Sequence, residues 1–179
     1  MRRSELAHVL RAAARIVDDP NILVIGSQAI LGTYSEDELP EDAWMSVEAD
    51  LAFLEDLDAR KADAVDGAIG ELSQFHETFA YYGQGVEVKT AVLPDGWQSR
   101  LVPFEIKGAD PAKAFCLDPH DLVLSKLIAM REKDVAFARS LLEADLVSRD
   151  RLLERAQTWS SAQPIAQTRV LAWLEAFGA

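Results

Sequence analysis

The chain has 179 residues, of which 49% are hydrophobic and 27% are charged, as expected for a globular protein with a hydrophobic core. Its 30 acidic and 18 basic residues give a net charge of −12, which disfavours broad nucleic-acid binding because proteins that bind many phosphates carry basic surfaces. No apolar stretch approaches the roughly 18 residues of a membrane span, and the single cysteine, Cys116, cannot form an internal disulfide, so we expect a cytoplasmic protein.

Helices and strands are predicted to alternate in the first half of the chain. The predicted elements, in order, are a helix at 4–17, a strand at 22–25, a short helix at 27–33, an acidic loop at 34–45, a strand at 46–54 and a helix at 57–72. Ser4 can cap the first helix, whose apolar stripe is interrupted by arginines, unlike a signal peptide. Gly67 and Gly70 weaken the prediction of a helix at 57–72.

The second half of the chain changes from strands to helices near residue 118. The predicted elements are one or two strands within 78–94 that break at Gly83 and Gly85, a turn at 95–97, a strand at 100–106, a helix at 118–145, and helices at 149–158 and 163–177. Asp118 can cap the long helix, with Pro119 in its first position. We therefore predict an α+β fold, with an α/β core at 1–117 and a C-terminal helical region at 118–179 packed on it.

Two acidic residues share one face of the predicted strand at 46–54. Because side chains alternate along a strand, Glu48 and Asp50 lie on one face, and the same face becomes apolar at Ala52 and Leu54. The acids therefore cluster at the start of the strand, at the rim of the sheet. Acids at this spacing can converge on a pair of divalent metal ions about 3.5–4 Å apart. Magnesium is commonly held by one or two carboxylates together with substrate phosphates.

A Gly-Ser turn separates the strand at 22–25 from the short helix that follows it. At such a turn, backbone N–H groups and the positive end of the helix dipole point at one spot. Gly26 lets a phosphate approach the backbone, and the Ser27 hydroxyl adds a donor. Each motif alone is more often structural, as a tight connection or as a solvated strand edge. Their order and spacing together favour a triphosphate held by the turn, with metal ions held by Glu48 and Asp50.

Basic residues occur in the long helix predicted at 118–145. If this helix is unbroken to Asp134, Lys126 lies on one stripe with three other residues: Leu122, Met130 and Lys133. A lysine in such a stripe either extends to water or reaches an anion. Asp134 either orients Lys126 or Arg131, or forms an ordinary surface ion pair.

Three segments, in this order along the chain, resemble the nucleotidyltransferase superfamily of the DNA-polymerase-β type. They are GSQAILG at 26–32, SVEADLAF at 46–53 and HDLVLSKLIAMREKD at 120–134. The longer match, over residues 20–145, is to bacterial nucleotidyltransferase-like proteins related to the toxin component of AbiE abortive-infection systems. The resemblance implies a mixed sheet flanked by helices, and Mg²⁺- or Mn²⁺-dependent transfer of NMP from an NTP to a protein, a tRNA or a small molecule. It also implies a toxin–antitoxin or defence setting, with a protein partner encoded by a neighbouring gene.

The resemblance assigns roles to individual residues. The nucleotide-binding residues it implies are Gly26, Ser27, Lys126, Arg131 and Lys133. The catalytic and metal-binding residues it implies are Glu48, Asp50 and a third carboxylate on a later strand. For this third position we prefer Glu87, because Val86 and Val88 flank it, over Glu105.

Two features favour an alternative function: Glu48 stands where the family usually has aspartate, and the third carboxylate is left open between Glu87 and Glu105. The loop at 34–45 is a further departure, because it lengthens the interval between the turn and the acids. If neither candidate for the third carboxylate points inward, the chain is a catalytically degenerate binding module that acts with a partner protein.

Other chemistries lack their motifs in this sequence. His8, His76 and His120 show no zinc-ligand spacing, IGSQA lacks the second glycine of a nucleophile elbow, and no Gly-Lys-Ser/Thr triplet occurs. Among the tryptophans, Trp44 precedes the acidic strand and is the candidate for stacking on a base.

Overall fold

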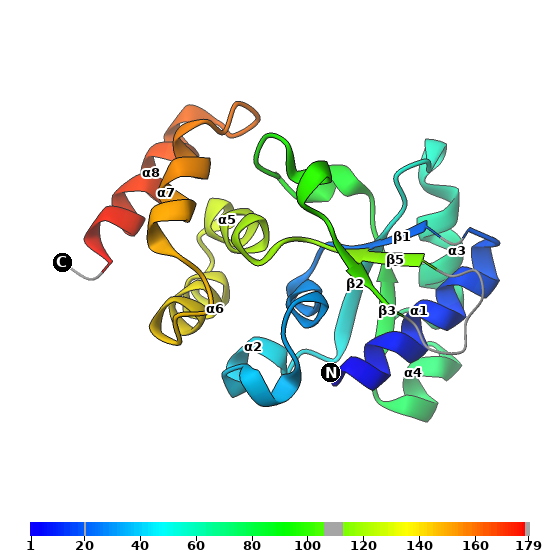
Figure 1. Cartoon of the computed structure of the whole chain (residues 1–179). Coiled ribbons are helices and arrows are strands. Elements are labelled where there is room, and N and C mark those ends of the chain that lie inside the picture. Colours follow the sequence, from blue (N-terminus) through cyan, green and yellow to red (C-terminus); the bar gives the residue numbers. More distant parts are fainter. Residues whose placement is uncertain (20, 106–112, 178–179) are drawn as a thin grey trace.

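The computed structural model of the chain describes residues 1–19, 21–105 and 113–177. Within these residues, one sheet contains five strands in the order β3-β2-β1-β5-β4 (Figure 1). The strands are β1 (Asn21–Val24), β2 (Glu48–Ala52), β3 (Tyr82–Gly85), β4 (Val102–Phe104) and β5 (Lys113–Cys116). β1 pairs antiparallel with β2 and parallel with β5, whereas β2 pairs parallel with β3, and β4 antiparallel with β5. The prediction of an α+β fold with a mixed sheet is confirmed.

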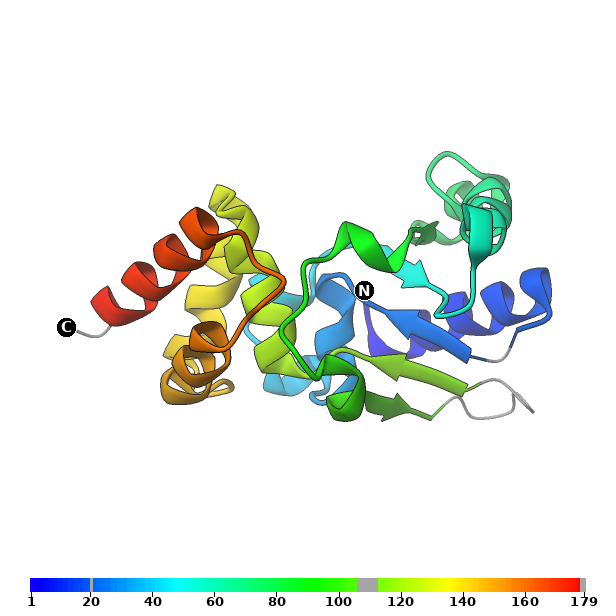
Figure 2. The same ribbon diagram turned by 90° about the horizontal axis from the view of Figure 1, so that it is seen from above.

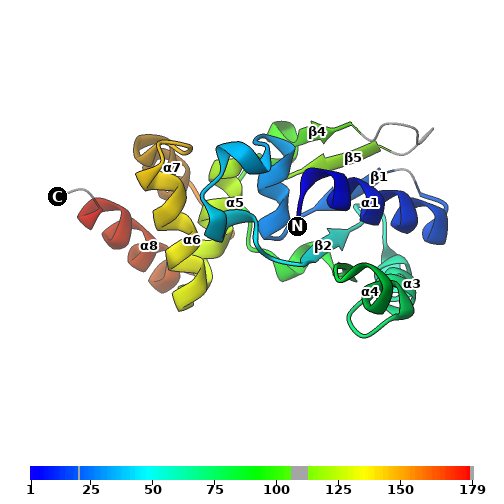
Figure 3. The same ribbon diagram turned by 90° about the horizontal axis from the view of Figure 1, so that it is seen from below.

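Helices flank the sheet and form the C-terminal part of the molecule. The α-helices are α1 (Arg3–Val17), α2 (Glu41–Trp44), α3 (Arg60–Ile69), α4 (Gln74–Phe79), α5 (Pro119–Ala129), α6 (Glu132–Glu143), α7 (Arg149–Gln157) and α8 (Pro164–Ala176). The 3-10 helices are η1 (Ser27–Gly32), η2 (Glu36–Glu38), η3 (Leu57–Ala59), η4 (Val88–Thr90) and η5 (Trp97–Arg100). α1, α3 and α4 lie together beside the sheet, whereas α5 to α8 extend beyond the carboxyl ends of β1 and β5 (Figure 1, Figure 3). No helix in the described part of the chain combines the length and the apolar character needed to cross a bilayer.

The hydrophobic core lies around the central strand of the sheet. Ile22, Leu23 and Val24 of β1 are almost completely buried, because β2 and β5 flank this strand. The apolar stripe predicted for the first helix packs against this core through its buried residues: Leu6, Val9, Leu10 and Ala13. Helix α1 therefore forms as predicted, and burial of this stripe attaches it to the sheet. Its N-cap is Arg2, however, so the prediction that Ser4 caps the helix was wrong.

The two glycines expected to break a strand both belong to β3. A Cβ atom on Gly85 would overlap the backbone carbonyl of Ala62 in α3, and one on Gly83 would lie 2.8 Å from Val9 Cγ1 in α1. Glycine is therefore required at these positions because two helices pack directly on the strand. Since β3 ends at Gly85, the predicted break there is confirmed, whereas the break predicted at Gly83 is wrong, because glycine in a strand also marks a close approach of another element.

The predicted helix at 118–145 consists of two helices, α5 and α6. Met130 has a left-handed backbone conformation, with φ of 52°, and its N–H donates to the Leu127 carbonyl, so α5 ends there. Asp118 caps α5 by accepting a hydrogen bond from the His120 N–H, as predicted. The predicted stripe that joins Lys126 to Met130 and Lys133 is therefore wrong, because Lys133 belongs to a separate helix.

Several other boundaries differ from the prediction. The helix predicted at 57–72 begins with η3 and ends at Ile69, and α4 follows after the Ser73 cap. The acidic loop at 34–45 contains η2 and α2, and the strand predicted at 46–54 is confined to Glu48–Ala52. Pro20 and Ile106, which belong to predicted boundaries, lie outside the described residues. β5 was not predicted, because a run of four residues next to the helix cap carries little periodic signal.

Buried polar contacts join the C-terminal helices to the first part of the chain. The fully buried Asp121 carboxylate of α5 accepts hydrogen bonds from Arg100 at 2.8 and 3.0 Å and from Arg155 of α7 at 2.7 Å. The Trp159 indole N–H donates to the Leu93 carbonyl at 2.9 Å. These contacts fix α5 and the α7–α8 link against segment 93–100.

Candidate active site

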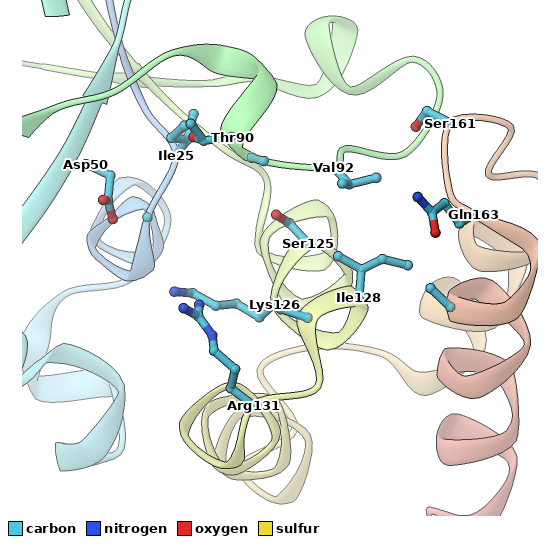
Figure 4. Close-up of a pocket in the computed structure, with 14 residues that line it drawn as sticks. Ile25, Asp50, Thr90, Val92, Ser125, Lys126, Ile128, Arg131, Ser161 and Gln163 are labelled. Atoms are coloured by element: carbon cyan, nitrogen blue, oxygen red, sulfur yellow. The ribbon is translucent and has the colours of Figure 1, made fainter.

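A cleft of about 520 Å³ lies between the carboxyl end of β1 and the C-terminal helices. Its lining comes from four places: the turn after β1 with the adjacent part of β2, segment 90–92 after β3, helix α5 with Arg131 before α6, and the link between α7 and α8 with the start of α8 (Figure 4). Segment 86–101 runs between the sheet and the C-terminal helices and meets the α7–α8 link (Figure 2). The cleft therefore joins residues that are far apart in the sequence.

The antiparallel pairing of β1 and β2 brings the Gly-Ser turn to the acidic strand. Val24 lies opposite Leu51, and the Ile25 N–H donates to the Asp50 carbonyl at 3.1 Å. The Asp50 side chain then covers Gly26 so closely that a Cβ atom on Gly26 would overlap Oδ2 of Asp50. Gly26 has an ordinary extended backbone, with φ of −84°, so the close approach of Asp50 is the reason that this position requires glycine.

Glu48 and Asp50 are held together in a partly buried place at the start of β2. Burial raises the pKa of Asp50, against the opposing effects of Lys126 and Lys133. Burial also raises the pKa of Glu48, and the neighbouring charge of Asp50 raises it further. Opposite Glu48 across the parallel pairing lies Tyr82, whose pKa is raised to about 12 by burial and by Glu48. Burial thus disfavours the charged forms of both carboxylates, and nearby cations stabilise these forms.

Basic side chains face this acidic pair across the cleft. Lys126 of α5 and Arg131, which precedes α6, both extend toward Asp50 (Figure 4). Asp134, only 1% exposed, lies 3.8 Å from Lys126 Nζ and accepts hydrogen bonds from Arg131 at 2.6 and 3.3 Å. Burial lowers the pKa of Lys126, although Asp134 and Asp50 act in the opposite direction. Asp134 therefore orients these basic side chains and does not form an ordinary surface ion pair, because it is buried.

The end of the cleft remote from Asp50 has a different, uncharged character. Val92 and Ile128 lie on opposite sides of it, and Ser161 and Gln163 from the α7–α8 link form its far boundary (Figure 4). No local sequence pattern identifies these residues, because they come from loops and a helix that only the tertiary fold brings together.

The structure brings together most, but not all, of the residues proposed from the sequence. Gly26, Asp50, Lys126 and Arg131 line the cleft. Three further residues adjoin it: Ser27 begins η1 directly after Gly26, Glu48 lies beside Asp50, and the charge of Lys133 acts on both acids. The 3-10 helix that Ser27 begins has six residues, so it provides a shorter dipole than the α-helix of the phosphate-site argument.

The two candidates for a third carboxylate lie away from the acidic pair. Glu87 forms an ion pair with Lys89 at 2.8 Å and does not line the cleft. Glu105 is exposed after β4, at the sheet edge opposite β3. Among residues 1–19, 21–105 and 113–177, no group of three or more Asp, Glu, His or Cys side chains is placed to hold a metal ion. Trp44 does not line the cleft either; its carbonyl accepts a hydrogen bond from Gln28.

A mixed sheet, a glycine turn against an acidic strand, and facing basic side chains are the arrangement expected of the nucleotidyltransferase class. Comparison with protein families supports this class: residues 4–175 match the family described as "Nucleotidyltransferase of unknown function (DUF6036)". The chain belongs to this family. No curated protein and no solved structure gave a match.

Proposed function

We propose that the protein is a Mg²⁺-dependent nucleotidyltransferase that moves NMP from an NTP to an acceptor. The observation that carries this proposal is the Asp50 carboxylate seated on Gly26, with Lys126 and Arg131 in the same cleft. A nucleoside triphosphate needs a cation to neutralise its phosphates and basic groups to hold them; one end of this cleft has a carboxylate that could hold the cation and basic side chains for the phosphates.

The chain's own residues divide the work of binding and orientation. The Gly26-Ser27 turn and Lys126 contact the β- and γ-phosphates, and Arg131 offsets charge that develops as pyrophosphate leaves. In the transfer, a bond forms between an acceptor oxygen and the α-phosphorus, and the bond from that phosphorus to pyrophosphate breaks. Asp134 holds Lys126 and Arg131 in place, so that neither has to be ordered during the reaction.

The two carboxylates of the cleft fit magnesium or manganese, provided that the nucleotide supplies the remaining ligands. Glu48 and Asp50 supply carboxylate oxygens, and burial raises the pKa of both because it disfavours their charged forms, an effect that a bound cation would oppose. When bound, the metal ion supplies charge neutralisation at the phosphates. Two carboxylates suffice for Mg²⁺ when phosphate oxygens and water provide the remaining ligands. A contribution from Glu87 remains part of the prediction from the sequence alone.

The proposal is tested by incubating the protein with each of four NTPs, Mg²⁺ and a cell lysate as the source of acceptor. Label placed on the α-phosphate should be transferred, whereas label on the γ-phosphate should not, which distinguishes nucleotidyl from phosphoryl transfer. Asp50→Asn should abolish transfer. Asp63→Asn changes an exposed aspartate of α3 in the same way and should leave it unchanged. Transfer that survives in Asp50→Asn would contradict the assignment of the site.

A second candidate function is a catalytically degenerate module that binds its partner without turning nucleotide over. The observation that favours it is that, within the described chain, neither Glu87 nor Glu105 joins the acidic pair in a group that could hold a metal ion. Thermal unfolding separates the two functions. An enzyme should be stabilised most by metal and nucleotide together, whereas a module that has lost the nucleotide site should respond to neither.

The resemblance to AbiE-related proteins extends the proposal to a toxin–antitoxin or defence pair. In this setting, transfer of NMP to a cellular acceptor arrests growth, and a protein from a neighbouring gene prevents it. Induced expression of the chain in a bacterial host should then stop growth, and Asp50→Asn should not. Co-expression of the neighbouring gene should restore growth of the wild type. Equal growth of wild type and Asp50→Asn would contradict this setting.

A further inference from the structure

We infer that the uncharged end of the cleft is the site for the nucleobase, and that the Gln163 side-chain amide recognises the edge of the base. This inference rests on the proposed function, because it assigns the remaining part of the same cleft. It names the class of ligand group, a flat neutral heterocycle with neighbouring hydrogen-bond donor and acceptor atoms. Gln163 is thereby a specificity-determining residue.

Charged and uncharged groups are distributed along the cleft as they are along a nucleotide. One end has Asp50, Lys126 and Arg131, whereas the other end has Val92, Ile128 and Gln163 (Figure 4). A nucleoside triphosphate has the same division, with charged phosphates at one end and a neutral aromatic ring at the other. The volume of about 520 Å³ lies within the usual range of small-ligand sites, roughly 300–1,000 Å³.

The walls of the uncharged end suit a flat ring. Val92 from the segment after η4 and Ile128 from α5 lie on opposite sides of the cleft (Figure 4). Apolar side chains on both faces of a ring bury it without competing for its hydrogen bonds, which then remain available at the edge. Ala166 of α8 also lines this end, and its small side chain leaves room for the base.

Gln163 lies where it can contact the edge of such a ring. It precedes α8 as the N-cap residue, with Pro164 in the first helical position, and its side chain extends toward the cleft (Figure 4). A side-chain amide provides a donor and an acceptor side by side, the pairing that glutamine makes with adenine in nucleic-acid recognition.

The link that carries Gln163 is tied to the opposite lip of the cleft. Trp159 Nε1 and Ser161 Oγ both donate to the Leu93 carbonyl, each at 2.9 Å, and Ser160 donates to Asp95 at 2.8 and 3.0 Å. These bonds hold the link at a fixed distance from segment 90–92. The Ser161 hydroxyl is engaged by these contacts, so Gln163 is the polar side chain of this link that is available to the base. A site built on such a fixed frame spends little binding energy on ordering.

The experiment compares binding of ATP, GTP, CTP, UTP and inorganic tripolyphosphate to the full chain, by calorimetry at constant free Mg²⁺. Wild type should bind at least one NTP more tightly than tripolyphosphate, which has no base. In Gln163→Leu, affinity for the preferred NTP should fall by about 5- to 50-fold, and the preference among the four should narrow. Affinity for tripolyphosphate should stay within about twofold. Gln157→Leu, at an exposed glutamine of α7, is the matched control and should bind all ligands as wild type does.

The other possible results overturn either this inference or the proposed function. Unchanged NTP affinities in Gln163→Leu overturn the inference, as does an equal loss of affinity for NTP and tripolyphosphate. Wild type that binds NTP and tripolyphosphate equally also overturns it, because the base then makes no contact, but the triphosphate site of the proposed function stands. Wild type that binds neither ligand contradicts the proposed function itself.

Discussion

Replacing Gly26 by alanine is expected to displace the Asp50 carboxyl group and to disrupt metal-dependent nucleotide binding. A Cβ atom at this position would overlap Oδ2 of Asp50 and lie 2.5 Å from its carboxyl carbon. Because carbon atoms in contact are normally about 3.5–4.0 Å apart, the carboxyl group has to move by at least about 1 Å. A displacement of this size at a reacting centre costs about 100-fold in rate. We therefore expect α-label transfer by Gly26→Ala to fall by about 100-fold, with weaker Mg-NTP binding by calorimetry.

A second glycine provides the control for this substitution. Gly67 lies on the exposed side of α3, and a Cβ atom there would have no neighbour within 4 Å. Gly67→Ala should raise the free energy of unfolding by roughly 0.5–1 kcal/mol, because alanine favours the helix, and it should leave transfer unchanged. The backbone of Gly26 is acceptable for alanine, so its variant should fold and melt cooperatively. A folded Gly26→Ala protein with wild-type binding and transfer would refute the contact argument.

Three further substitutions test the contacts around the cleft. Lys126→Met should weaken NTP binding by about 10- to 100-fold in calorimetry, since it removes a charge-assisted contact with phosphate. Asp121→Ala leaves Arg100 and Arg155 without their buried acceptor; thermal unfolding should show a loss of about 3 kcal/mol, or about 6–12 °C in Tm. Although burial alone raises the pKa of Asp118, hydrogen bonds with His120 and Arg155 lower it. Its charge therefore stabilises the fold above the ordinary carboxyl pKa of 3.8, and stability is lost as pH falls below that value. Urea titrations should find Asp118→Asn less stable than wild type by about 1 kcal/mol at pH 7, with a smaller difference at pH 3.

The local order of the chain allowed much of the fold to be predicted. The stripe of α1, the short strand before Gly26, the acids of β2 and the Asp118-Pro119 cap are each determined by neighbouring residues. The order of the chain also predicted that the Gly-Ser turn and the acidic strand act together, although residues 25–47 and their three helical segments separate the two strands. The antiparallel pairing of β1 and β2 brings Asp50 to Gly26. These features need only periodicity, alternation and capping.

Other features depend on contacts that a local pattern does not contain. The glycines of β3 appear as strand breakers until α1 and α3 are seen to pack on them. The end of α5 at Met130 has no glycine or proline to mark it, so the helix was expected to continue. Gln163 lies in the α7–α8 link, which reaches the cleft through a long-range contact. In this contact the Trp159 indole N–H donates a hydrogen bond to the carbonyl of Leu93, 66 residues earlier in the chain. The parts of the site that were not predicted from the sequence are therefore the parts that long-range packing determines.

The register between β2 and β3 determines how the acidic pair can bind a metal ion. Tyr82 lies opposite Glu48, and Gln84 lies opposite Asp50, so the positions next to the pair on β3 are a phenol and an amide. In the described chain no third acid joins the pair, and the phosphates of the nucleotide have to complete the coordination of magnesium. Metal and nucleotide should then bind cooperatively, each raising the affinity of the other by the same factor. Calorimetry should show weak Mn²⁺ binding to the chain alone and at least about tenfold tighter binding with a non-hydrolysable NTP present, beyond what the nucleotide binds in free solution. Equal Mn²⁺ affinity with and without nucleotide would mean that Glu48 and Asp50 form a complete site on their own, and that the nucleotide contributes no ligand.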